Sequence, residues 1–274
     1  MVSGGVTIAD TTGAFSVLEA AWGYDHPPEA FPDIAGYAAF FPGPMDAGRG
    51  GRRLSVVPEP PAAPVEDLRR VHEAQTRLMA AIGSLSDRQV GRATHLPGWT
   101  VGHVLTHVAR NADSHRRRAE AAVTGDVIDQ YPGGPEGRAA EIEAGARRSA
   151  GELLDDLRRS AVAMDAAWRA VPDGAWGHRT RDVGGRERPL CELPARRWQE
   201  LEIHLVDLDL GVTVRDWPDD FVSAWLSRLR AGAGRRLPEG AVLPAPGALD
   251  DREELAWLYG RVRRDDLAEL APWQ

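Results

Sequence analysis

Two segments of this chain combine the hydrophobic pattern of a helix with side chains that can hold a metal ion, and they restrict its fold most strongly. In RWQELEIHLVDL (residues 197–208), Glu200 and His204 lie four positions apart, so on a helix both project from one face. Apolar residues surround the pair, which indicates a partly buried helix where unpartnered polar groups are costly. A shared metal ion would satisfy both side chains, although the spacing alone also suits an exposed polar pair.

The second segment, residues 100–113, is expected to form another helix. Pro97 and Gly98 break the chain before it, and Thr100 is suited to cap a helix that begins near Val101.

Two histidines, His103 and His107, lie four positions apart in this helix. Zinc protease helices have the same spacing, but the glutamate that follows the first histidine there is Val104 here, so a protease of that type is not expected. His107 together with Glu200 and His204 would offer one carboxylate and two imidazoles to a single divalent ion. Three protein ligands with an open fourth position are typical of a catalytic zinc site.

The chain is expected to contain three parts: an N-terminal extension (1–64), a metal-binding bundle (65–210) and a small C-terminal cap (211–274). Hydrophobic spacing typical of helices covers four stretches of the middle part. These stretches are residues 65–85, 101–123, 137–170 with a break expected near Gly145 or Gly151, and 193–210. Four such helices fit a bundle, in which ligands projecting from facing helices can meet in the core.

The N-terminal extension is rich in glycine and proline. Residues 20–24 and 34–41 are predicted as two short strands beside a proline-rich turn, residues 48–53 as a flexible stretch, and residues 58–64 as a stiffer linker. About 60 residues can bury little surface alone, and no catalytic role is assigned to them.

The C-terminal cap is predicted to be α/β. Its expected elements are a helix around residues 218–231, a short strand at 241–243 and a helix around 252–264.

Composition excludes several classes of function. The net charge of −8 is acidic and unclustered, so nucleic acid is not the expected partner. The sequence contains no lysine, which rules out Schiff-base chemistry on a lysine of this chain. No apolar run approaches the roughly 18 residues of a membrane helix, and the N-terminus lacks the pattern of a secretion signal.

Cys191 is the only cysteine, so no intramolecular disulfide can form and a cytoplasmic protein is expected. The residue lies near an expected helix start, where backbone N–H groups could stabilise a thiolate. The alternative is a packing role for this side chain.

The two metal-ligand segments resemble the signature segments of the mycothiol-dependent maleylpyruvate isomerase family, which belongs to the DinB/YfiT-like metal-dependent four-helix bundles. The resemblance rests on LPGWT (96–100), HVLTHVARNA (103–112) and ELEIHLVDL (200–208), and it covers about residues 66–210. It implies a mainly α fold in which His107, Glu200 and His204 hold a divalent metal, with zinc as the expected ion. His103 matches a position that is not a ligand, and His178 is given no role beyond that of a loop histidine.

The resemblance also implies a reaction. Mycothiol, a low-molecular-weight thiol, would be the cosubstrate, and zinc would lower the pKa of its thiol. Reversible addition of the thiolate to a conjugated cis double bond of a small electrophilic acid would permit rotation and then elimination to the trans isomer.

In the family, a C-terminal domain contributes an arginine, and LAWLYGR (255–261) makes Arg261 the candidate here. Arg261 would bind a substrate carboxylate and is the expected catalytic and cosubstrate-site residue. The alternative is a solvated surface arginine near a helix end. This C-terminal part looks shorter than the family's usual one.

Two other functions stay open from the sequence: a mycothiol S-transferase on the same site, and a non-catalytic regulator that binds a metal or a ligand. The run at residues 20–41 is also similar to the C-terminal end of a small β-rich family, the DUF427 domain, without the rest of that domain.

Overall fold

The computed structural model describes residues 61–271 and, in the N-terminal part, the backbone of six short strands. The chain divides into two compact units, residues 1–59 and 60–274, and each is described by itself.

The first unit contains two small antiparallel sheets. One has the strand order β1 (Val6–Thr7), β2 (Ser16–Val17), β5 (Asp46–Arg49) and β6 (Arg52–Ser55), and the other pairs β3 (Ala21–Gly23) with β4 (Ala38–Phe40). The two predicted strands are thus present in shortened form.

Residues 48–49 and 52–53 of the predicted flexible stretch instead belong to the paired strands β5 and β6, with Arg49 opposite Arg52. Residues 50 and 51 lie outside the described residues. The DUF427 resemblance stays a prediction.

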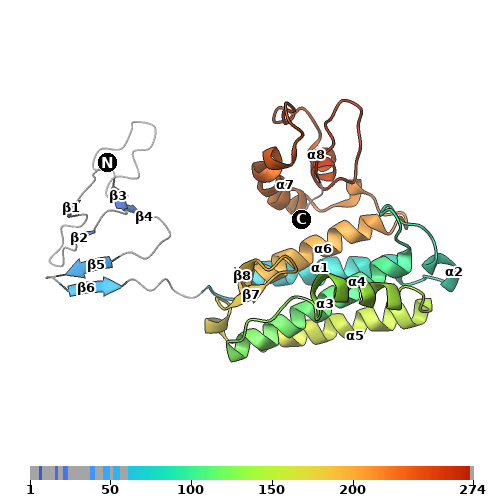
Figure 1. The fold of residues 1–274 in the computed structure, drawn as a ribbon, viewed down its shortest axis with the longest axis horizontal. Coiled ribbons are helices and arrows are strands. Elements are labelled where there is room, and N and C mark those ends of the chain that lie inside the picture. The colour runs from blue at the N-terminus through green and yellow to red at the C-terminus, as the bar shows by residue number, and fades with distance from the viewer. Residues whose placement is uncertain are drawn as a thin grey trace. The chain divides into compact units, whose positions relative to one another are not determined.

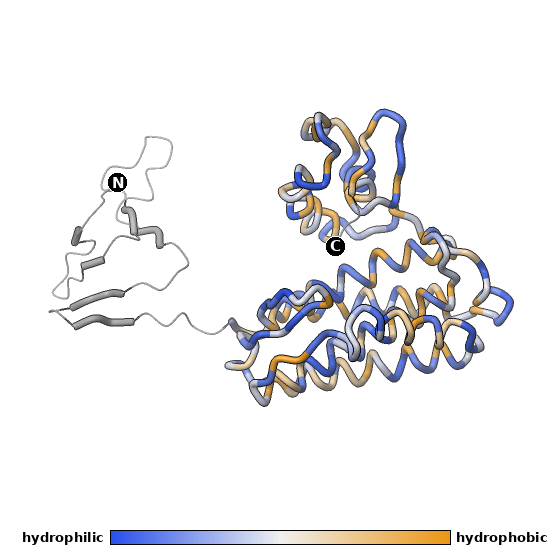
Figure 2. The backbone as a smooth tube through the Cα atoms, in the orientation of Figure 1, coloured by the Kyte–Doolittle hydropathy of each residue, from blue (hydrophilic) through white to orange (hydrophobic). Residues whose placement is uncertain are grey.

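Four long helices form the bundle of the second unit (Figure 1): α1 (Val65–Ile82), α3 (Val101–Thr124), α5 (Ala150–Arg169) and α6 (Leu193–Asp207). Helix α3 packs mainly along α5, and α1 along α6. Hydrophobic and hydrophilic positions alternate along these helices, as Figure 2 shows. This confirms the predicted mainly α bundle.

The predicted helix at residues 137–170 is two helices, α4 (Gly134–Gly145) and α5, so the expected break lies just after Gly145. Ser149 caps α5 because its hydroxyl accepts from the N–H of Glu152, while the Glu152 carboxylate accepts from the N–H of Ser149 at 2.9 Å. The short helix α2 (Asp87–Val90) precedes α3.

Gly102 allows the start of α3 to lie against the connection between α4 and α5. A Cβ atom at this position would stand 2.0 Å from the carbonyl oxygen of Ala146 and 2.9 Å from a methyl carbon of Val90. Only glycine permits this close approach, which sets the start of the helix that carries His107.

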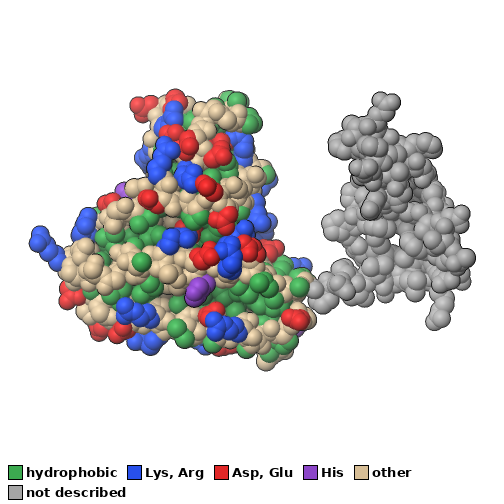
Figure 3. Space-filling view, turned by 180° about the vertical axis from the view of Figure 1, so that it is seen from behind, with side chains coloured by type: hydrophobic (Ala, Val, Ile, Leu, Met, Phe, Trp, Pro, Cys, Tyr) green, Lys and Arg blue, Asp and Glu red, His purple; other side chains and the backbone are tan. Residues whose placement is uncertain are grey.

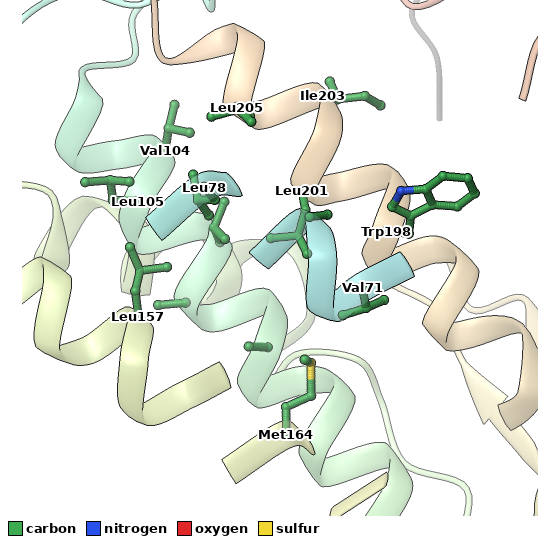
Figure 4. Close-up of a cluster of buried hydrophobic side chains, with 14 of the residues drawn as sticks. Val71, Leu78, Val104, Leu105, Leu157, Met164, Trp198, Leu201, Ile203 and Leu205 are labelled. Atoms are coloured by element: carbon green, nitrogen blue, oxygen red, sulfur yellow. The ribbon is translucent and has the colours of Figure 1, made fainter. Parts of the chain in front are cut away.

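The core of the bundle is one cluster of buried side chains, part of which is drawn in Figure 4. Leu78, Leu105 and Leu157, from α1, α3 and α5, are fully buried, and Leu201 of α6 packs into the same cluster. These side chains hold α3 and α6 side by side, and those helices carry the metal-ligand residues.

The C-terminal cap lies over α6 (Figure 1) and contains α7 (Asp219–Ala233) and α8 (Asp251–Leu258). Trp217, Phe221 and Tyr259 belong to the same buried core as the bundle. The indole N–H of Trp217 donates to the backbone carbonyl of Glu202 in α6 at 3.1 Å, which fastens the cap to the bundle.

Two expectations for the cap are wrong. Residues 241–243 form no strand, because no neighbouring strand is present to pair with them and Val242 is 84% exposed, so the described cap is α rather than α/β. The helix expected to reach residue 264 ends at Leu258, where Gly260 follows with φ 71° and closes the helix in the left-handed conformation.

A hairpin between α5 and α6 was not predicted. Its strands are β7 (Arg179–Arg181) and β8 (Glu187–Pro189). No helix in the described part of the chain is both long and apolar enough to cross a bilayer. On the face shown in Figure 3, arginine and acidic side chains are interspersed.

Candidate metal centre

Helices α3 and α6 bring His107, Glu200 and His204 together, as the sequence predicts. The Nε2 atom of His107 lies 3.0 Å from Glu200 Oε2, and the Nε2 atom of His204 lies 3.3 Å from the same oxygen. One ligand atom from each residue falls within 4.8 Å of the others. Tetrahedral zinc with bonds of about 2.0–2.1 Å separates its ligand atoms by about 3.3 Å, so the donor set fits such an ion.

The triad is mostly buried, and Glu200 is its most exposed member. The side chains of His107 and His204 are 4% and 11% exposed, whereas that of Glu200 is 23% exposed. Solvent therefore reaches the ligand set at Glu200.

Mutual contacts set the charges of the triad. Burial lowers the pKa of His107 to about 4, and its hydrogen bond to Glu200 offsets only part of that effect. Burial by itself would raise the pKa of Glu200, but the hydrogen bonds from both histidines hold it well below its ordinary value. Burial likewise disfavours the charged form of His204, yet Asp207 and Glu200 raise its pKa to about 9. Without metal at neutral pH, Glu200 is a carboxylate, His107 is neutral and His204 is protonated.

Asp207 orients His204, and the sequence reasoning missed it. Its Oδ2 atom accepts from His204 Nδ1 at 2.9 Å, which directs Nε2 towards Glu200, and its side chain is fully buried. A carboxylate behind a ligating histidine fixes the tautomer and the ring orientation. The spacing of three residues from His204 on the same helix was a signal that could have revealed it.

Arg261 reaches the site through Asp207. Its Nε and Nη2 atoms donate to the two carboxylate oxygens of Asp207 at 2.8 Å each, and Nη1 donates to the Tyr259 carbonyl at 2.7 Å. The side chain is 19% exposed, which rules out the alternative of a solvated surface arginine. Its role towards a substrate carboxylate stays a prediction.

The remaining singled-out residues lie outside the triad. His103 Nδ1 accepts from the backbone N–H of Thr100 at 3.2 Å and so helps to cap α3. The ring of His178 bonds the carbonyl of Ala122. Cys191 is half-buried, and burial raises the pKa of its thiol, which favours packing over a reactive thiolate.

An arginine from α4 also stands beside the triad and was not predicted. Arg138 Nη2 donates to His107 Nδ1 at 3.2 Å, and its guanidinium lies 5.9 Å from the Trp99 ring and 5.7 Å from the Tyr131 ring. Trp99 in turn meets the His107 ring edge-on at 5.7 Å. No spacing signal in the sequence links α4 to α3, because the contact arises only from tertiary packing.

The family model for the mycothiol maleylpyruvate isomerase N-terminal domain matches residues 46–209. Among solved structures, the fold is similar to that of the mycothiol-dependent maleylpyruvate isomerase, with 24% identity, a TM-score of 0.69, and coverage of 77% of this chain and 97% of that chain. A histidine-to-alanine mutant of that isomerase matches over the same shares with 23% identity and a TM-score of 0.69.

YfiT from Bacillus subtilis, described with an unusual four-helix bundle topology, matches more weakly, with 18% identity, a TM-score of 0.45, and coverage of 54% of this chain and 85% of that chain. No curated protein sequence gave a significant match. The expected shortening of the C-terminal part stays a prediction.

Proposed function

Because this chain belongs to the mycothiol maleylpyruvate isomerase N-terminal domain family, we propose that it is a metal-dependent enzyme that uses mycothiol to isomerise a small electrophilic acid. The observation that carries the proposal is the convergence of His107, Glu200 and His204 on one point beside partly exposed surface. Two imidazoles and one carboxylate suit zinc, and we propose zinc as the ion.

Each residue of the site has a separate task in this proposal. His107, Glu200 and His204 would hold the ion and leave a position for the cosubstrate. Asp207 keeps the His204 ring oriented, and Arg261 keeps Asp207 charged and in place. The ion, when bound, would lower the pKa of the mycothiol thiol, so that a thiolate is present at neutral pH.

The thiolate would add to one carbon of the cis double bond, and the electron pair would move onto the conjugated carbonyl group. The former double bond is then single and can rotate. Return of the electron pair expels the thiolate and leaves the trans isomer, so that mycothiol is regenerated. The chain need not supply a nucleophile, which agrees with the raised pKa of the Cys191 thiol.

A cytoplasmic location is part of the proposal, because the chain has a single cysteine and the reaction needs a reduced thiol. The substrate and mycothiol are its proposed small-molecule partners.

The test follows maleylpyruvate and mycothiol together in the presence of zinc-loaded protein. An isomerase converts maleylpyruvate to its trans isomer while the mycothiol concentration stays constant. Consumption of mycothiol into a stable adduct would instead identify an S-transferase. Failure to turn over maleylpyruvate or a panel of other electrophiles, with zinc bound, would contradict an enzyme and leave a binding protein.

A further inference from the structure

Arg138 is a half-buried cation beside the triad, and no acidic side chain of residues 61–271 pairs with it. Its only hydrogen bond among residues 61–271 is the one to His107 Nδ1, and its guanidinium otherwise faces the rings of Trp99 and Tyr131. Aromatic faces attract a guanidinium but leave most of its N–H groups free in the ring plane. Arg138 therefore retains donors that a ligand can use.

Three other arginines are already paired with carboxylates. Arg110 bonds Asp156 at 2.8 Å, and Arg148 bonds the same carboxylate at 2.8 Å. Two nitrogens of Arg261 donate to the Asp207 carboxylate. Their positive charges are neutralised by these carboxylates, so they are poorer anchors for an incoming acid than Arg138.

We propose that Arg138 binds a carboxylate of the acid substrate beside the metal site, and that Arg261 is a positioning residue that holds Asp207 against His204. The inference rests on the proposed function, because that function supplies the acid. A guanidinium binds a carboxylate through two parallel N–H groups, which fixes the orientation of the acid as well as its affinity. The aromatic contacts restrict the guanidinium beforehand, which lowers the entropic cost of binding.

The experiment is titration calorimetry of zinc-loaded protein with maleate, without any thiol, so that no reaction occurs. Arg138→Gln should weaken maleate binding by about tenfold to hundredfold, as expected when a charge-assisted contact is lost. Arg147→Gln is the matched control, because Arg147 follows α4 by two residues, is 87% exposed and pairs only with Glu143 among residues 61–271. The control should bind maleate as the wild type does.

Measuring the zinc content of Arg138→Gln and Arg261→Gln distinguishes the roles of the two arginines. Arg138→Gln should keep its full zinc content, whereas Arg261→Gln should lose zinc affinity because Asp207 loses its partner. Equal maleate affinity in the wild type and Arg138→Gln would overturn the inference, as would the absence of maleate binding to the zinc-loaded wild type.

These outcomes are independent of the proposed reaction. If maleate binding depends on Arg138 but maleylpyruvate is not isomerised, the carboxylate site stands and the reaction is wrong. If the protein isomerises maleylpyruvate with the same KM in Arg138→Gln as in the wild type, the reaction stands and the carboxylate site is wrong.

Discussion

At the scale of single residues, the metal centre depends on three side chains and on a fourth that orients one of them. His107, Glu200 and His204 supply the ligand atoms, and Asp207 fixes the His204 ring from behind. His103 lies one turn before His107 but points its Nδ1 atom at the backbone of Thr100. Substituting His107 or His204 is therefore expected to affect zinc binding much more than substituting His103.

His107→Ala and His204→Ala should each abolish stoichiometric zinc binding, because two protein ligands hold the ion too weakly. His103→Ala is the control and should keep most of its zinc. Metal analysis after dialysis gives the content of each variant. Equal zinc content in the wild type and both ligand variants would show that the triad does not bind zinc. Complete loss of zinc in His103→Ala would show that His103 is a ligand.

Zinc binding should release about one proton per ion near pH 7.5, because His204 has a pKa of about 9 without metal and must lose its proton to use Nε2. Affinity should therefore rise about tenfold per pH unit up to about pH 9 and then level off. Calorimetry in buffers of different ionisation enthalpy counts the protons. Asp207→Asn removes the contact that raises the pKa of His204, so this variant should release fewer protons when zinc binds. An unchanged number of protons would contradict the assigned role of Asp207.

The same pKa values fix how the metal-free protein responds to pH. His204 has a folded-state pKa above its unfolded value, so its contribution to stability is present at low pH and is lost as the pH rises through about 9. His107 has a folded-state pKa of about 4, below its unfolded value, so stability is lost as the pH falls from about 6.5 towards 4.

At the scale of elements, the position of α3 depends on a glycine. Gly102→Ala would push a methyl group into the Ala146 carbonyl and should lower the free energy of unfolding by about 1–3 kcal/mol. Gly151 is the matched control, since it is also the second residue of a helix but has no atom within 4 Å of an added Cβ. Gly151→Ala should be neutral or stabilise by up to about 1 kcal/mol. Urea unfolding measures the free energy of unfolding of both variants. An equal change in the two variants would show that the structure accommodates the added methyl group at residue 102 without loss of stability.

Sequence reasoning located the starts of the long helices better than their ends. The predicted starts at residues 65, 101 and 193 are those observed, because a proline-containing entry or a capping threonine stands at each. The predicted ends at 85 and 210 run three residues too far, because apolar residues such as Leu85 and Leu210 continue beyond the last helical turn. The β7–β8 hairpin was missed because its short strands consist mostly of charged residues without alternation.

The site was partly predictable for a similar reason. Glu200 and His204 share a helix and show the spacing of a ligand pair, and the resemblance supplied His107. Arg138 belongs to a separate short helix and approaches His107 only after α4 has packed on α3. Contacts between elements of this kind leave no periodic trace in the sequence.

At the scale of the whole molecule, the bundle and the cap share one core, and the cap delivers Arg261 to Asp207 beneath the metal-ligand residues. The division into bundle and cap after residue 210 stays a proposal, since residues 60–274 form one compact unit. The cap thus supports the centre through Asp207, and the chain offers the ligands for the ion but no activated thiol of its own.

Whether mycothiol is the nucleophile is tested most directly by the rate of maleylpyruvate isomerisation by the zinc-loaded protein as a function of mycothiol concentration, for the wild type and Cys191→Ser. We expect no turnover without mycothiol and the same saturating dependence on mycothiol in both proteins, because the thiol comes from the cosubstrate. Turnover that persists without added thiol, or that disappears in Cys191→Ser, would place the nucleophile in the chain and contradict a mycothiol-dependent reaction.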